Sequence, residues 1–256
     1  GIDVSLVASL ITKINDTIIE KALDKVLEDI PESAEISFTW LSLGSEGREE
    51  QLLRTDQDNA ILFEDSDQHE EHQKILLKVA ESVNEMLMTC GFEKCPADIM
   101  AQNPEFCQPL SVWKDYFSKW IATPDPKSVM HATIFFDFRI SYGNPELAHK
   151  LEEHLIHELQ EHEMFLKFLA QNALQNPPPL SFFKNFLVES SGEHKDEFDI
   201  KKRAMMPLSD GARLLLMDHL IMGIHNTSDR YRKLAEFESN NASLYESSAD
   251  AYELFM

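Results

Sequence analysis

Two short polar motifs near the start of the chain carry residue types that could handle a phosphate and a metal ion. Gly44 and Ser45 follow an apolar segment directly, and Asp56 and Asp58 come shortly afterwards in the string Thr-Asp-Gln-Asp-Asn. Residues i and i+2 of an extended segment point the same way, so the two carboxylates could hold one Mg²⁺ ion or a pair of them. The glycine lets backbone approach a triphosphate, and the serine offers a hydroxyl and an N–H. The combination predicts a site for metal-dependent nucleotidyl transfer.

Each motif by itself has a simpler explanation. Gly-Ser pairs are common in turns, and an Asp-x-Asp string usually lies in a solvated loop with a capping role. The spacing of the two motifs and the apolar strands that flank them favour a nucleotide or metal site. Arg48 could offer a forked cation to the phosphates, or it could form a salt bridge with Glu49, Glu50 or another nearby carboxylate.

The order of these segments resembles the signature of the DNA polymerase beta-like nucleotidyltransferase superfamily. The fuller strings Gly-Ser-Glu-Gly-Arg-Glu-Glu-Gln and Thr-Asp-Gln-Asp-Asn are similar to one branch of it. That branch is the nucleotidyltransferase domain found beside CBS and cyclic-nucleotide-binding modules in bacterial signalling proteins, and it is related to the uridylyltransferases of the PII protein. Gln57 replaces the hydrophobic residue usual between the paired acids of the wider superfamily. The likeness continues over most of the chain, in residues 95–104, 136–139, 178–183 and 199–201.

The resemblance implies an activity and a set of partners. An acceptor would attack the α-phosphorus of a nucleoside triphosphate and expel pyrophosphate. Asp56 and Asp58 would hold Mg²⁺ or Mn²⁺ and act in catalysis, while Gly44 and Ser45 would seat the β- and γ-phosphates. An upstream CBS or cyclic-nucleotide-binding module would be a further partner.

The superfamily often adds a third carboxylate from a later strand, and two residues of this chain are candidates. Asp98 occupies the place where related adenylyl and uridylyl transferases carry theirs, which makes it the candidate base or further metal ligand. Asp137 is the alternative, although an ion pair with Arg139 would explain it equally well. Lys201, in the string Asp-Ile-Lys, would reach the nucleotide from the C-terminal part of the chain.

The net charge disfavours some substrates of the superfamily. The 256 residues include 23 Lys and Arg against 45 Asp and Glu, which gives a net charge of −22. Such a charge repels a phosphate backbone, so we expect no nucleic-acid partner. A protein or small-molecule acceptor is favoured over tRNA-end addition or RNA tailing.

The chain shows no secretory signal and no membrane span, because charged residues interrupt its first thirty positions. We therefore expect a cytoplasmic protein without a membrane partner. The three cysteines, Cys90, Cys95 and Cys107, include no Cys-x-x-Cys pair. Neither a disulfide framework nor a zinc site is expected.

Apolar periodicity predicts an α+β fold, with a small mixed-sheet nucleotidyltransferase domain followed by a helical domain. The predicted parts are an amphipathic helix at 1–30, the nucleotidyltransferase domain at 31–144 and the helical domain at 145–256. Prolines and the loss of strand signals set the last boundary. The first helix either packs on the catalytic domain or connects it to an upstream module.

Individual elements follow from the same patterns. Residues 129–140 fit neither the helical nor the strand period, so they are predicted to form either a strand or a buried helix. Strands are predicted at 36–43, 59–64 and 92–101, and helices at 68–89, 145–172, 180–189 and 207–225, with two short helices at the end.

Two further groups of residues have a structural explanation. Trp113, Phe117 and Trp120 share one face of a helix and are expected in the core, since no basic residues interleave them as in a base-stacking surface. His154, His157 and Glu161 also share a helix face, and a solvated face accounts for them better than a metal site.

Two rivals to a transferase remain at this point. One is a sensor that binds nucleotide in the same pocket without turnover. The other is a helical dimerisation protein with a vestigial pocket, which the intact Gly-Ser pair and both aspartates argue against.

Overall fold

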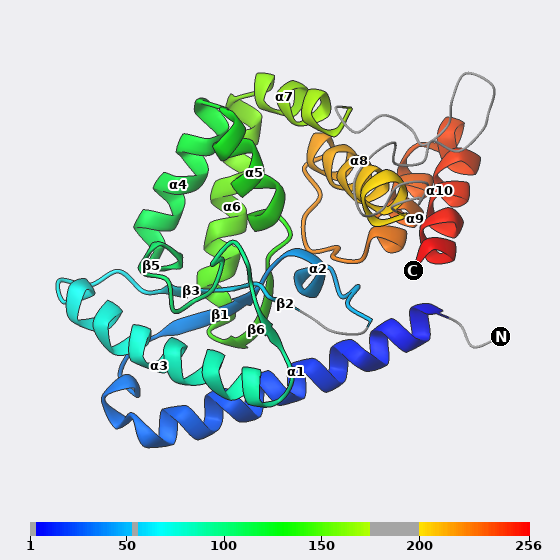
Figure 1. Ribbon diagram of the computed structural model, residues 1–256. Helices are drawn as coiled ribbons and strands as arrows, with labels where there is room; N and C mark the ends of the chain where they lie inside the picture. The colour runs from blue at the N-terminus through cyan, green and yellow to red at the C-terminus, as the bar shows by residue number, and fades with distance from the viewer. Residues whose placement is uncertain (1–3, 53–55, 175–199) are drawn as a thin grey trace, which may run out of the picture. The chain divides into compact units, whose positions relative to one another are not determined.

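The computed structural model describes residues 4–52, 56–174 and 200–256, apart from the side chain of Lys202. The chain folds as two compact units, Gly1–Glu161 and His162–Met256. The first combines a mixed sheet with helices, and the second is helical in its described residues. The predicted α+β class is therefore confirmed (Figure 1).

A four-stranded sheet forms the centre of the first unit. Its strand order is β5-β3-β1-β6, with β1 (Phe38–Ser42) antiparallel to both β3 (Asn59–Phe63) and β6 (Arg139–Gly143). The short strand β5 (Cys107–Pro109) runs parallel to β3. These two strands confirm the first two predicted ones, and every residue of both is buried. A separate parallel pair joins β2 (Asp56–Gln57) to β4 (Glu93–Lys94).

Helices cover both faces of this sheet. In Figure 1, α1 and α3 lie on one side of the sheet, and α4 and α6 lie on the other. Ile19, Leu23 and Val26 in the second half of α1 are buried in one core cluster with Trp40 of β1, so this half of α1 packs on the domain. The helical elements of the first unit are α1 (Val4–Asp29), η1 (Pro31–Ser33), α2 (Gly44–Gly47), α3 (His69–Thr89), η2 (Pro104–Phe106), α4 (Leu110–Ala122), α5 (Pro126–Phe135) and α6 (Pro145–Glu161).

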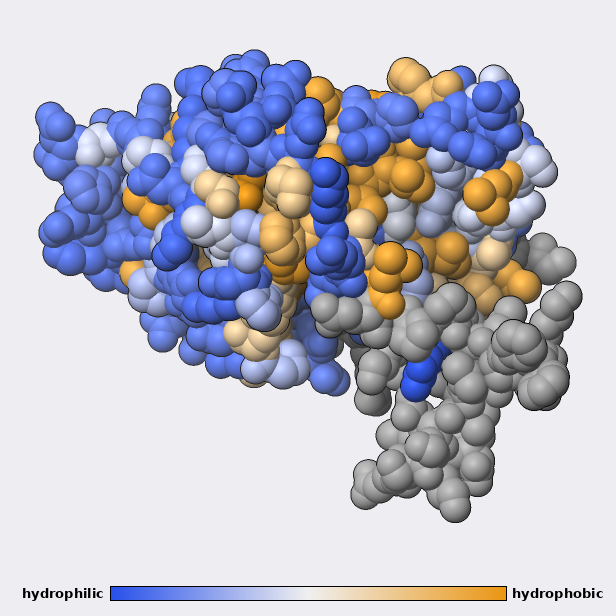
Figure 2. All heavy atoms as spheres, turned by 90° about the horizontal axis from the view of Figure 1, so that it is seen from above, coloured by the Kyte–Doolittle hydropathy of each residue, from blue (hydrophilic) through white to orange (hydrophobic). Residues whose placement is uncertain are grey.

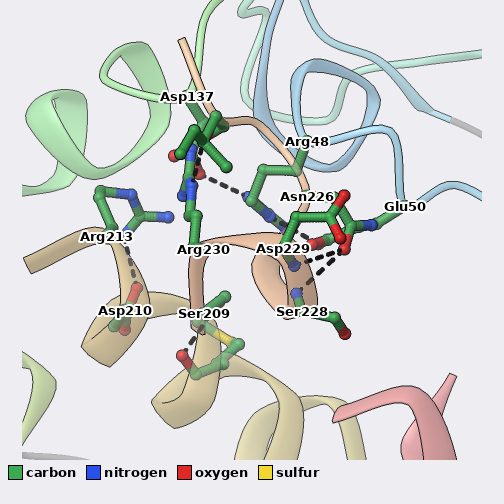
Figure 3. Close-up of polar contacts among 12 residues, drawn as sticks. Arg48, Glu50, Asp137, Ser209, Asp210, Arg213, Asn226, Ser228, Asp229 and Arg230 are labelled. Atoms are coloured by element: carbon green, nitrogen blue, oxygen red, sulfur yellow. Dashed lines mark hydrogen bonds and ion pairs between the residues drawn. The ribbon is translucent and has the colours of Figure 1, made fainter. Parts of the chain in front are cut away.

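The second unit has its own core. Leu216 of α8, Tyr231 and Leu234 of α9 and Tyr245 of α10 are buried together. The Asn226 side chain caps α9 by accepting hydrogen bonds from the backbone N–H groups of Ser228 and Asp229 (Figure 3). The predicted helix at 180–189 lies outside the described residues. The helical elements of this unit are α7 (Met164–Ala173), η3 (Lys201–Met205), α8 (Met206–Asp218), α9 (Thr227–Phe237), η4 (Ser239–Asn241) and α10 (Ala242–Phe255).

The strand predicted at 92–101 is wrong beyond its first residues. Only Glu93 and Lys94 are in a strand, and Ile99 to Ala101 are buried in irregular backbone. Their backbone groups bond to Asn59, whose N–H donates to the Ile99 carbonyl at 3.2 Å and whose Oδ1 accepts from the Ala101 N–H at 2.8 Å. A side chain thus replaces the ladder partner that a strand would need.

The ambiguous segment 129–140 contains a change of structure, since α5 ends at Phe135 and β6 begins at Arg139. The two compact units divide after α6, between Glu161 and His162. The reason is packing: Leu147, Leu151 and Leu155 of α6 are buried, and the helix contacts α4, β1 and β3.

Trp113, Phe117 and Trp120 are buried, which confirms their place in the core. Hydrophilic side chains cover most of the face drawn in Figure 2, in keeping with the charge of −22. Within the described ranges, no helix is both long enough and apolar enough to span a bilayer. All three cysteines are free thiols.

Candidate active site

The Gly-Ser motif forms the single helical turn α2 directly after β1. The turn is closed by backbone bonds from Gly47 N–H to the Leu43 carbonyl at 2.9 Å and from Arg48 N–H to the Gly44 carbonyl at 3.0 Å. Gly44 has a φ of 55°, in the left-handed region that glycine adopts without strain. Gly44 and Ser45 are both partly exposed, so the turn is open to a ligand on that side.

Asp58 lies directly over this turn. The Leu43 N–H donates to the Asp58 carbonyl at 2.8 Å, and a Cβ built on Gly44 would come 2.9 Å from Asp58 Oδ2. The backbone angle therefore favours glycine at this position, and the close approach shows that the Asp58 carboxylate lies against the turn. The structure thus brings the two sequence motifs together.

Asp56 lies on the same short segment, two residues before Asp58. It is exposed and Asp58 is partly exposed, while Gln57 between them is fully buried and exchanges hydrogen bonds with Asn84. This alternation is expected of an extended segment and places both carboxylates opposite the buried glutamine.

Asp98 lies in an exposed turn rather than on a strand. Its φ is 54°, and Asn103 Nδ2 donates to both its carbonyl and its Oδ2 at 3.1 Å. The next residue, Ile99, bonds to Asn59, which follows Asp58 in the chain. The backbone therefore ties the loop of Asp98 to the strand that follows the paired acids.

The same loop brings the Cys95 thiol to Asp58. Burial, and after it the hydrogen bond with the Asp58 carboxylate, raise the pKa of this thiol to about 11. The thiol is therefore neutral at physiological pH and acts as a donor to the carboxylate. Sequence reasoning missed this contact, although Cys95 belongs to the string that carries the family resemblance.

Arg48 is held between two carboxylates (Figure 3). Its Nε donates to Glu50 Oε2 at 2.7 Å, and its Nη1 donates to Asp137 Oδ2 at 2.8 Å. The Asp137 side chain is fully buried. The salt-bridge alternative for Arg48 is therefore the one that the structure shows.

The ion pair expected between Asp137 and Arg139 is wrong. Asp137 precedes β6, which begins at Arg139, so the two side chains do not share a strand face. Arg139 instead binds Asp16 of α1 through two hydrogen bonds, of 3.0 and 2.8 Å.

Glu46, within the turn itself, is a buried acid that the sequence did not single out. It is 5% exposed, and its Oε1 has no hydrogen-bond partner. Its pKa is raised to about 8, chiefly by burial; Arg139 lowers this pKa, and Asp16 and Asp58 raise it. Glu46 is therefore largely protonated at pH 7.

The raised pKa predicts how the stability depends on pH. Between about pH 4.5 and 8 the folded protein holds a proton on Glu46 that the unfolded chain releases. The contribution of this proton to the free energy of unfolding is therefore complete below about pH 4.5 and is lost as the pH rises to about 8. It amounts to at most several kcal/mol, at about 1.4 kcal/mol per pKa unit. Glutamine stays neutral at every pH. The melting temperature of Glu46→Gln minus that of the parent protein should therefore increase from pH 5 to pH 8. Thermal melts in chelator at pH 5, 6.5 and 8 check this, and a difference independent of pH would contradict it.

Lys201 is exposed at the start of η3 in the second unit. Its predicted contact with the nucleotide stays a prediction. His154 Nε2 lies 2.8 Å from Ser118 Oγ and 3.2 Å from the Lys114 carbonyl oxygen, so its ring packs against α4.

The donors at the turn suit a hard divalent cation. Mg²⁺ is usually bound by one or two carboxylates together with substrate phosphates and water. Asp58 supplies such an oxygen donor beside the turn, and Asp56 supplies a second one from the same segment, on the side opposite the buried Gln57. Among the described residues, no group of three or more His, Cys, Asp or Glu could hold a metal ion.

A glycine turn beneath an acid, on a small mixed sheet followed by a helical unit, is the arrangement of a nucleotidyltransferase with a separate helical domain. Residues 1–127 match the family model described as "Putative nucleotidyltransferase DUF294". Residues 163–256 match the model "Putative nucleotidyltransferase substrate binding domain". Together the two matches cover most of the chain, so both of its parts are similar to domains of the family described as "Putative nucleotidyltransferase DUF294". No curated protein matches it.

Proposed function

We propose that the protein transfers a nucleoside monophosphate from a nucleoside triphosphate to a protein or small-molecule acceptor, with Mg²⁺ or Mn²⁺ as cofactor. The observation that carries this proposal is the Asp58 carboxylate, held so close over the Gly44 turn that a Cβ on Gly44 would lie 2.9 Å from its Oδ2. Phosphates seated on the turn would lie next to this carboxylate. That proximity of acid and phosphate is what metal-dependent nucleotidyl transfer requires.

Each residue of the site has a role in this proposal. Backbone amides of the turn and the Ser45 hydroxyl bind the β- and γ-phosphates. Asp56 and Asp58 hold the cation, which when bound neutralises nonbridging oxygens and the charge on the leaving pyrophosphate. The acceptor attacks the α-phosphorus in line, and the bond to pyrophosphate breaks.

The third acid in the proposal is Asp98, which is exposed. The residue after it, Ile99, accepts a hydrogen bond from the Asn59 N–H. Asp98 would accept the proton of the acceptor. Asp137 suits a different role, because its buried carboxylate holds Arg48. That pair fixes the segment that follows the turn.

The acceptor class follows from charge. A net charge of −22 repels nucleic acid, so we propose a protein or small-molecule acceptor. Lys201 would contact the nucleotide from the second unit, whose family model carries the words "substrate binding domain". The resemblance to uridylyltransferases of the PII protein supports a role in bacterial signalling. In that role the protein would be regulated by an upstream CBS or cyclic-nucleotide-binding module.

A nucleotide-binding sensor with weak or no turnover is the second candidate. Two observations favour it: Asp137 is occupied by Arg48, and Asp98 lies in an exposed turn held by Asn103. Neither residue is placed by the described structure as a third ligand beside Asp58.

One labelling experiment separates these two functions. The protein is incubated with Mg²⁺, a lysate of the source cell and each nucleoside triphosphate, labelled at the α- or the γ-phosphate. Transfer of α-label but not γ-label to an acceptor, lost in Asp58→Asn, supports the transferase. Binding of nucleotide without transfer of either label supports the sensor, and transfer of γ-label alone would indicate a kinase and contradict both.

A further inference from the structure

The first half of α1 reaches the candidate site through a buried arginine. Asp16 on α1 binds both terminal nitrogens of Arg139, with Nη1 to Oδ2 at 3.0 Å and Nη2 to Oδ1 at 2.8 Å. The Arg139 side chain is only 9% exposed. A forked, charge-assisted pair of this kind fixes the plane of the guanidinium.

The same guanidinium bonds to the turn. Arg139 Nη2 donates to the backbone carbonyl of Glu46 at 3.4 Å, and Arg139 Nε lies 3.7 Å from Glu49 Oε1. Glu46 is the third residue of α2, so the arginine holds the turn from its buried side.

The neighbouring residue of α1 reaches the other half of the site. Asn15 Nδ2 donates to Gln51 Oε1 at 3.4 Å, and Gln51 Nε2 donates to the carbonyl of Asp56 at 3.3 Å. Gln51 is also buried. Two adjacent positions of α1 therefore connect to the phosphate turn and to the segment of the paired acids.

We propose that Asp16 and Arg139 are positioning residues, which hold the turn α2 in the geometry that receives the phosphates. Arg139 acts through the Glu46 carbonyl, and Asp16 acts by orienting Arg139. Asn15 and Gln51 fix the backbone of Asp56 in the same way. This proposal rests on the proposed function, in which the turn binds the phosphates of a nucleotide.

The test uses Asp16→Asn, because Arg139 is itself buried and pairs with both Asp16 and Glu49, so that its removal could prevent folding. Asp24→Asn is a closely matched control. Asp24 lies on the same helix, is 41% exposed against 32% for Asp16, and accepts a hydrogen bond of 3.1 Å from Tyr142 of the same strand β6. Both substitutions remove one charge from a residue of α1 that bonds to β6, but only Asp16 connects to the turn through Arg139.

Hydrogen exchange of the amides of Gly47, Arg48 and Glu50 reports directly on the turn, since these amides close it. In Asp16→Asn their exchange should accelerate roughly tenfold or more, the effect of losing a hydrogen bond to a charged group. Asp24→Asn should leave them unchanged, and Asp16→Glu should restore most of the protection. Affinity for Mg²⁺-ATP should fall about tenfold in Asp16→Asn only, as for other residues that orient a site.

Equal exchange in the two asparagine variants, or no change in either, would overturn the proposal. The exchange measurement needs no nucleotide. If the turn loosens as expected but the parent protein binds no nucleoside triphosphate, the positioning role stands and the proposed function fails.

Discussion

Replacing Gly47 with alanine is expected to destabilise the first unit by about 3 kcal/mol, at the upper end of what overpacking usually costs. A Cβ at this position would lie 2.0 Å from the Asp137 carbonyl oxygen and 2.8 Å from that of Ser42. Both are backbone atoms, one at the end of β1 and one just before β6, so the sheet would have to shift. Chemical denaturation followed by circular dichroism measures the loss.

Gly91→Ala provides the control for this experiment. Gly91 follows α3, has a φ of 100°, and a Cβ there would meet no atom within 4 Å. Its substitution costs only the backbone strain of about 1 kcal/mol. Equal losses of stability in the two variants would show that the close approach of β1 and β6 to Gly47 is not what limits the position.

Replacing Asp58 with asparagine is expected to lower metal-dependent nucleotide binding and transfer by at least about 100-fold, the upper end of what loss of a merely supporting residue costs at metal sites. The substitution removes a charged ligand and keeps the shape of the side chain. The carboxylate is partly exposed, so the melting temperature should change little. Isothermal titration with Mg²⁺-ATP and thermal melts measure the two effects.

Asp67→Asn removes the same charge from an exposed position shortly after β3 and serves as the matched control. Its affinity should equal that of the parent protein. A comparable loss of affinity in both variants would attribute the effect to net charge rather than to Asp58 itself.

The central part of the site could be predicted from sequence because its geometry is local. The register of the antiparallel pair places Ser42 opposite Asn59. The turn after β1 and the acids before β3 must then meet at the same edge of the sheet. Recognising the two apolar strands and their order was therefore enough to bring Gly44 and Asp58 together.

The charged network behind the turn could not be predicted in this way. Asp16 and Arg139 are 123 positions apart, and Arg48 and Asp137 are 89 apart. Apolar periodicity indicates which face of α1 is buried, but it does not say which polar residue each position meets. The expected Asp137–Arg139 pair is wrong because the two residues, although close in the sequence, do not share a strand face.

The strand predicted at 92–101 failed for a related reason. Its apolar residues are buried as expected, but the Ala101 N–H donates to the side chain of Asn59, where a strand would use a neighbouring backbone carbonyl. The outer strand of the sheet on that side is instead β5, Cys107–Pro109, which is too short to show an alternating pattern.

Equilibrium binding of a nucleoside triphosphate in chelator and in Mg²⁺ tests the account most directly. Two carboxylates without a cation repel each other and the triphosphate, so affinity should be very weak in chelator and should increase sharply on addition of Mg²⁺ or Mn²⁺. Asp58→Asn should abolish that increase. Equal affinity in chelator, in Mg²⁺ and in the variant would contradict the proposal that Asp56 and Asp58 hold a cation for nucleotidyl transfer.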